Sequence, residues 1–153
     1  MALLQIAEPG SAPEMNTERQ IGVGIDLGTT NSLIAHFDGA DLNVLADDTG
    51  QASLPSVVYY GASQTLVGAD AERYASAEPS NTIASAKRML GRSREEFEYD
   101  PYIQLAAGEG LAFATDAGAK TPVEVSAAIL TALKNSAEPQ LNGPIVGAVI
   151  TVP

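Results

Sequence analysis

Apolar and polar residues alternate over the first patterned segment of the chain. Val23, Ile25 and Leu27 are each separated by one small or polar residue, which is typical of a strand with one buried face. Two further apolar runs follow, and Asp38-Gly39 between them is a strong turn signal. The pattern predicts an antiparallel meander of three strands at residues 21–27, 32–37 and 42–45.

The middle of the chain mixes strand-like and helix-like patterns. These patterns predict a hairpin of strands at 57–60 and 65–67, then helices at 69–77 and 81–90. Pro79 would stop the first helix, while Asn81 can cap the second and Gly91 can end it. Residues 92–118 carry no clear period, and we expect irregular structure with short strands there.

The last third of the chain begins with a strong helix-start signal. Thr121 can cap a helix, Pro122 fits its first turn, and Glu124 can bond back to the cap. Three apolar residues then share one helical face: Val125, Ile129 and Leu133. Pro139 ends this helix, and residues 145–152 form a mostly apolar segment that predicts a buried strand. Because a domain rarely stops directly after a buried strand, we expect the sequence to be a fragment of a longer protein.

The composition is that of an ordinary soluble globular protein. Its 153 residues, 45% of them hydrophobic, suffice for one domain with a core. The formal net charge of -11 repels nucleic acid and anionic membranes, so neither is an expected partner. The absence of cysteine excludes disulfides and cysteine-based sites, and it fits a cytoplasmic location. Residues 1–20 lack a signal-peptide pattern and are expected to form a flexible arm.

The turn after the first strand is the first candidate for chemistry. It consists of Gly28, Thr29, Thr30 and Asn31. Such a turn can direct backbone N–H groups and two hydroxyls at one point, and a glycine lets the backbone approach phosphate oxygens closely. Asp26, two residues before the turn, could hold a hydrated magnesium ion. The alternative is a plain hairpin turn with polar side chains, which is the default connection in a meander.

Lys87 is the second candidate. The predicted helix 81–90 would place it on the packed face with Ile83, four residues earlier. A lysine on a packed face must extend to water or meet an anion. Two interpretations therefore stay open: a lysine that snorkels at a subdomain edge, or one that reaches a phosphate or an attacking water.

Four segments together resemble the seventy-kilodalton heat-shock chaperones. They are IGVGIDLGTTNS (21–32), which is similar to that family's first phosphate loop, LPSVVYY (54–60), NTIASAKRMLGR (81–92) and GAVITVP (147–153). They occur in the family's order and at similar spacing. Within the family the chain is most similar to the HscA branch, which serves iron–sulfur cluster assembly. The features are LLQIAEPG (3–10), Ser32-Leu33 and PVEVSAAIL (122–130).

The resemblance implies an α/β fold, the actin-like (ribonuclease H-like) ATPase fold with two lobes around a nucleotide cleft. This chain would be the first part of lobe I only, a truncated N-terminal lobe at residues 21–153. Residues 21–55 and 140–153 would form a core subdomain, and residues 56–139 a peripheral one. The family's second lobe, adenosine pocket and peptide-binding domain would lie beyond residue 153.

The same resemblance assigns roles to single residues. Binding of ATP or ADP would fall to Gly28, Thr29, Thr30 and Asn31, the last three contacting the β- and γ-phosphates. Asp26 would bind Mg²⁺ through water, while Lys87 would contact the γ-phosphate and position the attacking water. Pro153 matches a proline that the family uses to relay nucleotide state to the substrate domain.

The implied function is that of the N-terminal part of an ATP-dependent chaperone. It would hydrolyse ATP to drive client binding and release in iron–sulfur cluster assembly, with a J-type co-chaperone and an iron–sulfur scaffold protein as partners. Two alternatives stay open. The chain could be an inactive fragment that self-associates through exposed core surface, since a cleft with one wall leaves the phosphates in water. It could also belong to an actin-fold small-molecule kinase, although the landmarks after residue 50 argue against a kinase.

Overall fold

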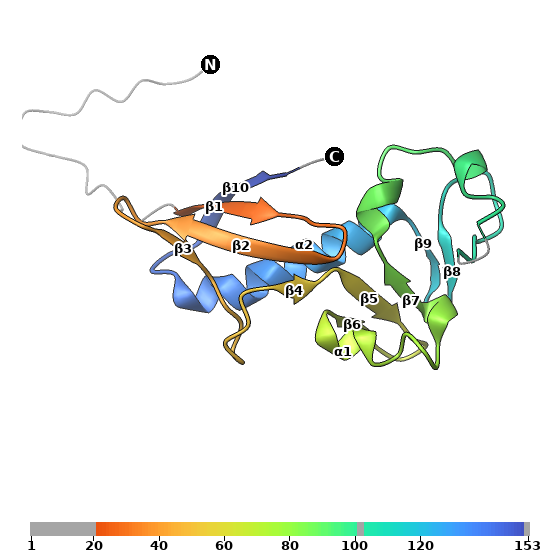
Figure 1. The fold of residues 1–153 in the computed structure, drawn as a ribbon, viewed down its shortest axis with the longest axis horizontal. Coiled ribbons are helices and arrows are strands. Elements are labelled where there is room, and N and C mark those ends of the chain that lie inside the picture. Colours follow the sequence, from red (N-terminus) through yellow and green to blue (C-terminus); the bar gives the residue numbers. More distant parts are fainter. Residues whose placement is uncertain (1–20, 101–102, 152–153) are drawn as a thin grey trace, which may run out of the picture.

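The computed structural model describes residues 21–100 and 103–151, so the expected arm at 1–20 and Pro153 lie outside the described residues. Within these ranges the chain is a mixed α/β structure. A long helix runs beside a first sheet, and a second group of short strands lies beyond one end of that sheet (Figure 1).

The first sheet contains the predicted meander. β1 (Ile21–Asp26), β2 (Asn31–Phe37) and β3 (Leu42–Val44) are antiparallel neighbours, as the sequence pattern predicts. β10 (Ile145–Ile150) lies parallel to β1 on its other side, and the short β4 (Leu54–Pro55) pairs with the start of β2. The strand order β10-β1-β2-β3 brings the last strand of the chain next to the first.

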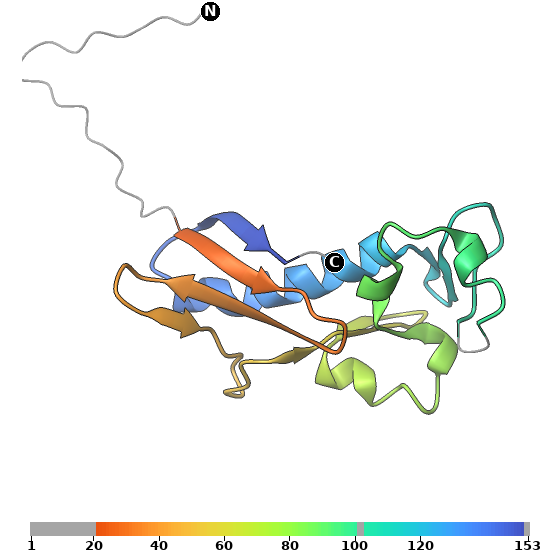
Figure 2. The same cartoon turned by 45° about the horizontal axis from the view of Figure 1, so that its top comes forward.

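The long helix α2 (Pro122–Ala137) covers one face of this sheet (Figures 1 and 2). Its start confirms the predicted cap, because the Thr121 and Glu124 side chains each accept a hydrogen bond from the other residue's backbone N–H. The predicted apolar face is buried as well, at Val125, Ile129 and Leu133. Burial of this face, more than helix propensity, is what stabilises such a helix in a protein.

A second sheet and a small hairpin form the other group of strands. β5 (Val57–Tyr60) is the central strand of the second sheet, between β6 (Thr65–Val67) and β7 (Thr82–Ala84). The hairpin of β5 and β6 has the bounds that the sequence predicts. β8 (Phe113–Thr115) lies in the segment 92–118 that is expected to be irregular with short strands. Its partner β9 (Gly118–Lys120) begins at the last residue of that segment.

One continuous apolar core joins the two larger sheets. Side chains from both sheets and from α2 belong to the same buried cluster, including Ile25, Ile34, Val58, Ile83, Val125 and Ile129. The two sheets are therefore packed around one helix, and a single residue, Ser56, separates β4 of the first sheet from β5 of the second.

The predicted helix at 81–90 is wrong, and the one at 69–77 is too long. Within residues 69–77, only α1 (Ala69–Glu72) is α-helical. Around residues 81–90, a 3₁₀ turn η1 (Pro79–Asn81) is followed by β7 and by a second 3₁₀ turn, η2 (Ala86–Met89). Ser85 stands between them with φ 58° and ψ 25°, a left-handed conformation that an α-helix does not contain. Strand pairing overrides helix propensity in this segment, since Ile83 is buried opposite Val58 on β5.

The strand predicted at 145–152 is present as β10, but it is not buried. Val146 is 57% exposed and Val149 is 78% exposed. β10 is an edge strand. On its neighbour β1, buried and exposed residues alternate, so the sheet face opposite α2 is open. On the α2 side, Leu130 and Ile150 both line a mostly apolar pocket of about 210 Å³. An apolar run predicts a strand but not the layers that cover it.

Two further 3₁₀ turns complete the described elements. η3 (Arg94–Glu96) lies in the irregular region, and η4 (Glu138–Gln140) contains Pro139 directly after α2, where the sequence predicts the end of that helix.

Candidate functional site

The candidate turn lies at the carboxyl ends of two neighbouring strands. Because β1 and β10 are parallel, the residues that follow them emerge at the same edge of the first sheet. Figures 1 and 2 both show η2, the green segment that contains Lys87, at this end of the sheet. The sequence candidates on β1, in the turn and in η2 therefore come from three segments that lie toward the same end of the first sheet.

Gly28 is required in the turn by space. A Cβ atom built on Gly28 would overlap the carbonyl oxygen of Asn31, so no larger residue fits without moving the backbone. Its backbone N–H donates to Ser32 Oγ at 3.2 Å. Gly28 thus fixes how tightly the turn closes, while its own N–H is engaged inside the protein.

The next two residues leave their backbone donors available. The N–H groups of Thr29 and Thr30 donate no hydrogen bond within the described part of the chain. Thr29 is half-buried, whereas Thr30 and Asn31 are exposed. Adjacent unpaired amides beside two hydroxyls are the kind of donor set that binds phosphate oxygens.

Asp26 supplies a carboxylate at the same edge. It is the last residue of β1 and is exposed. Its Oδ1 accepts a hydrogen bond from Thr151 Oγ1 at 2.7 Å, and the Thr151 backbone N–H donates to the carbonyl of Ile25 at 3.0 Å. One carboxylate that otherwise faces water suits Mg²⁺, which keeps several of its own waters when it binds to protein.

Thr151 is a site residue that the sequence reasoning missed. Its contact with Asp26 joins residues 125 positions apart in the chain. Ile25 pairs with Ile150, so the parallel register of β1 and β10 places Thr151 opposite Asp26. A prediction that these two strands are parallel neighbours would have been the signal needed to find it.

Lys87 lies in a different local structure from the one predicted. It belongs to the 3₁₀ turn η2 and not to a helix shared with Ile83, so the argument from a common helical face is wrong. Ala86 and Met89 on either side are buried, and η2 packs against α2. The Lys87 side chain is half-buried, and its ammonium group has no hydrogen bond or ion pair with any residue in the described ranges. Its assignment to a phosphate stays a prediction.

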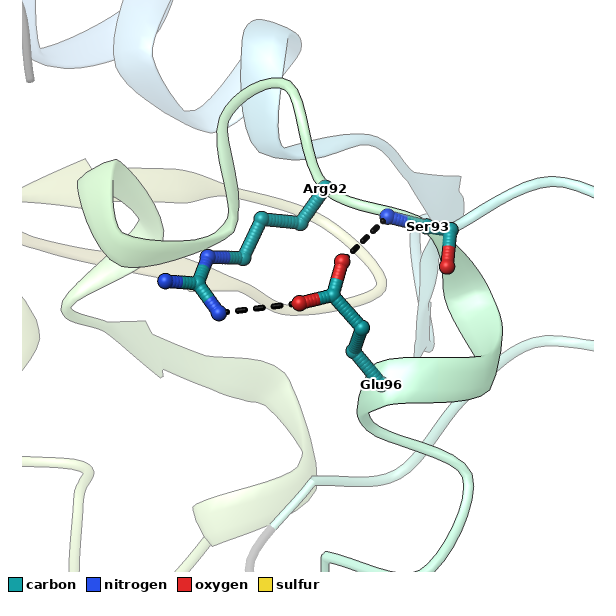
Figure 3. Close-up of polar contacts among 3 residues, drawn as sticks. All are labelled: Arg92, Ser93 and Glu96. Carbon is teal, nitrogen blue, oxygen red and sulfur yellow. Dashed lines mark hydrogen bonds and ion pairs between the residues drawn. The ribbon is translucent and has the colours of Figure 1, made fainter.

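The neighbouring basic residue Arg92 is engaged in a local loop structure. Figure 3 shows the Arg92 guanidinium paired with the Glu96 carboxylate, whose other oxygen accepts the backbone N–H of Ser93. The distances are 2.9 Å from Arg92 Nη1 to Glu96 Oε2 and 3.0 Å from the Ser93 nitrogen to Glu96 Oε1. The Ser93 and Glu96 contacts form a capping box for η3. Both charged side chains are exposed, so the pair contributes little to stability, and it leaves Arg92 bound to a carboxylate.

The described residues contain neither a metal-binding cluster of side chains nor a membrane-spanning helix. In residues 21–100 and 103–151, no three histidine, aspartate or glutamate side chains come together as a metal-binding group. Over the same ranges, no helix has the length and apolar character needed to cross a membrane.

Comparison with known proteins gives the family. The family model described as "Hsp70 protein" matches residues 22–153. Relatives named "Chaperone protein HscA homolog" match over 100% of this chain. Those of Acinetobacter baumannii strain AYE, Actinobacillus pleuropneumoniae serotype 5b and Vibrio parahaemolyticus are 48%, 49% and 49% identical, respectively. The chain covers 25% of the length of each of these curated relatives.

These matches confirm the resemblance that the sequence motifs indicate, including the likeness to the HscA branch. The family model extends well past residue 50, which speaks against the small-molecule kinase. The match spans the β1 turn, η2 and β10, and the chain belongs to the Hsp70 protein family.

Proposed function

We propose that this chain forms one wall of the nucleotide site in an ATP-hydrolysing chaperone, with the turn after β1 binding the terminal phosphates. The observation that carries the proposal is the donor set at the carboxyl edge of the first sheet. The amides of Thr29 and Thr30, which have no partner among the described residues, lie at the same edge as the Asp26 carboxylate. With Gly28 closing the turn, this edge offers donors to an anion and a carboxylate to a hydrated cation.

The roles of single residues follow from that chemistry. Thr29, Thr30 and Asn31 would hold the β- and γ-phosphates of ATP or ADP, and Asp26 would hold Mg²⁺ through water. When bound, Mg²⁺ neutralises charge on the phosphate oxygens. Because the net charge of -11 repels an anion such as ATP, a local positive charge is needed beside the phosphates, and Lys87 would supply it. Lys87 would also position the attacking water.

The finer fold assignment belongs to the same proposal. In the actin-like ATPase fold, residues 21–153 would be the first part of lobe I. Residues 21–55 and 140–153 would form its core subdomain and residues 56–139 its peripheral one. The first sheet draws its strands from the two ends of the described chain, while the second sheet lies between them in sequence, which supports such a division. Pro153 would relay the nucleotide state to a substrate domain.

The wider function rests on the relatives. We propose a role in iron–sulfur cluster assembly in the cytoplasm, with a J-type co-chaperone and an iron–sulfur scaffold protein as partners. The support is the 48–49% identity to relatives named HscA homologs. The alternative is that residues 1–153 alone are an inactive fragment.

Nucleotide binding by the chain alone tests that alternative. The turn and Asp26 lie at an exposed edge, where each polar contact competes with water and is weak. Isothermal titration calorimetry of residues 1–153 with Mg-ATP is expected to show no binding. Micromolar affinity would contradict the view that one wall is insufficient.

The catalytic assignment is tested in the full-length protein that we propose contains this chain. Lys87→Ala should lower the rate of ATP hydrolysis on the order of 10²-fold while ATP affinity changes much less, because the ammonium acts mainly on the transition state. Arg88→Ala is the matched control, since Arg88 is an exposed neighbour on the same turn. Unchanged turnover in the Lys87 variant would remove this residue from the mechanism.

A further inference from the structure

A pair of buried serines lies directly beneath the candidate turn. Ser32 on β2 is 1% exposed, and Ser56, between β4 and β5, is 2% exposed. Their hydroxyl oxygens are 2.8 Å apart, so one hydroxyl donates to the other. Buried polar groups cost free energy unless they are hydrogen-bonded, and an apolar residue would serve a purely packing role better.

Both serines bond to the turn itself. Ser32 Oγ accepts the backbone N–H of Gly28 at 3.2 Å. The backbone N–H of Ser56 donates to the carbonyl of Thr30 at 2.7 Å. The first and third residues of the turn are therefore bonded to one two-serine unit, and the Thr29 and Thr30 amides are the donors left over.

The pair also links the turn to another part of the fold. Ser56 directly precedes β5, the central strand of the second sheet, and is separated from Ser32 by 24 positions in sequence. A shift of the β4–β5 segment would move Ser56, and with it the hydrogen bonds that reach Thr30 directly and Gly28 through Ser32. The conformation of the turn thus depends on Ser56, which lies outside the β1–β2 hairpin.

We propose that Ser32 and Ser56 are positioning residues that hold the Thr29 and Thr30 amides in a phosphate-binding arrangement and couple it to the β4–β5 segment. The phosphate-binding role in this inference rests on the proposed function. The hydrogen bonding of the turn by the two serines does not, and it is tested separately in the chain alone.

The first experiment measures amide hydrogen exchange by NMR in the chain of residues 1–153. Ser32→Ala removes the acceptor of the Gly28 N–H, so this amide should exchange roughly five- to tenfold faster, the factor expected for the loss of one hydrogen bond. Ser53→Ala is the matched control, because Ser53 is exposed three residues before Ser56. Should Ser32→Ala unfold the chain, Ser32→Cys gives the same test with the Gly28 amide as the reporter, because a thiol of similar size is a much weaker acceptor than the hydroxyl. Unchanged exchange at Gly28 in both variants would overturn the bonding scheme.

The second experiment measures affinities for ATP and for adenosine by calorimetry in the full-length protein. Ser32→Ala and Ser56→Ala should weaken ATP roughly tenfold while leaving adenosine unchanged, and the double variant should lose less than the product of the two single losses. A merely structural role would lower both affinities together or neither, and either result would overturn the positioning role. Absence of ATP binding by the wild-type protein would instead refute the proposed function, with the exchange result still standing.

Discussion

At the scale of single residues, Tyr59 combines a buried ring with a hydroxyl that meets a carboxylate. The ring stacks on Tyr74 with centroids 4.1 Å apart, and the hydroxyl donates to Glu78 Oε2 at 2.8 Å. The same oxygen accepts from Asn81, which also donates to Asp116. The hydrogen bond to Glu78 raises the pKa of Tyr59 to about 12.

This contact predicts a pH dependence at alkaline pH. A tyrosine whose pKa is higher in the folded state, here about 12, than in the unfolded chain, about 10, stabilises the fold fully below pH 10. That stability is lost as the pH rises through 12. Tyr59→Phe should lower the free energy of unfolding at pH 8 and reduce its fall between pH 10 and 12, as measured by urea unfolding.

The alkaline loss should shrink but not vanish in that variant, because burial raises the pKa of Tyr60 to about 12 as well. Tyr99→Phe is the control, since Tyr99 is 90% exposed. Identical curves for Tyr59→Phe and wild type would refute the role of the Glu78 contact.

Gly28 gives a second prediction at this scale. Gly28→Ala places a Cβ atom on the Asn31 carbonyl oxygen, so the turn must open, and we expect a loss of about 1–3 kcal/mol in the free energy of unfolding. Gly24→Ala, four residues earlier, is the matched control, because a Cβ there meets nothing within 4 Å. It should change stability by no more than about 0.5 kcal/mol. Equal effects of the two substitutions in chemical denaturation would contradict the steric argument.

At the scale of elements, the start of α2 is set by its capping box. Thr121 Oγ1 accepts the backbone N–H of Glu124 at 3.2 Å, and Glu124 Oε2 accepts the backbone N–H of Thr121 at 2.7 Å. This second bond lowers the pKa of Glu124 below its ordinary 4.5. A lowered carboxyl pKa stabilises the fold above the unfolded value, and the effect is lost as the pH falls through the folded value.

Removing the cap should therefore weaken the helix. Thr121→Ala is expected to cost about 1 kcal/mol at pH 7. The stability gap from wild type should narrow as the pH falls through the lowered pKa of Glu124, because protonation weakens the hydrogen bond that Thr121 Oγ1 donates to the Glu124 carboxylate. Thr131→Ala, an exposed position inside α2, should change stability little. The measurement is thermal unfolding followed by circular dichroism, and a gap of the same size at pH 3 and pH 7 would contradict the coupling to Glu124.

The elements that could be predicted from sequence are those with local signals. The cap and apolar face of α2, the β1–β2–β3 meander and the β5–β6 hairpin all rest on residues close together in the chain. The structure of segment 81–90 could not be predicted this way, because it depends on pairing with β5, whose other edge is already paired with β6. Ile83 gains more by pairing there than by extending a helix.

The candidate site divides along the same line. The turn after β1 was placed correctly because glycine and polar residues mark it locally. Thr151 and Ser56 were missed because each reaches its partner only through strand pairing over long sequence distances. Lys87 lies in the 3₁₀ turn η2 and not in the predicted helix 81–90, and its contact with a phosphate stays a prediction.

At the scale of the whole molecule, one face of the first sheet is packed and the other is open. α2 covers the face of Val23 and Ile25, while Gly22 and Gly24 on the other face are exposed. Val149 pairs with Gly24 and is 78% exposed on that side, and Val146 is 57% exposed on the same edge strand. An exposed apolar edge strand is a common site of association between chains.

We therefore expect residues 1–153 to self-associate through β10, against the repulsion of a net charge of -11. Because salt screens that repulsion and leaves apolar contact intact, association should strengthen between low and high ionic strength. Val149→Glu should abolish it in light scattering. Val123→Glu adds the same charge at a residue that is 66% exposed on α2, and it should leave association in place. A wild-type chain that stays monomeric at high salt would show that the open face is not adhesive, and equal loss in both variants would trace the effect to charge rather than to β10.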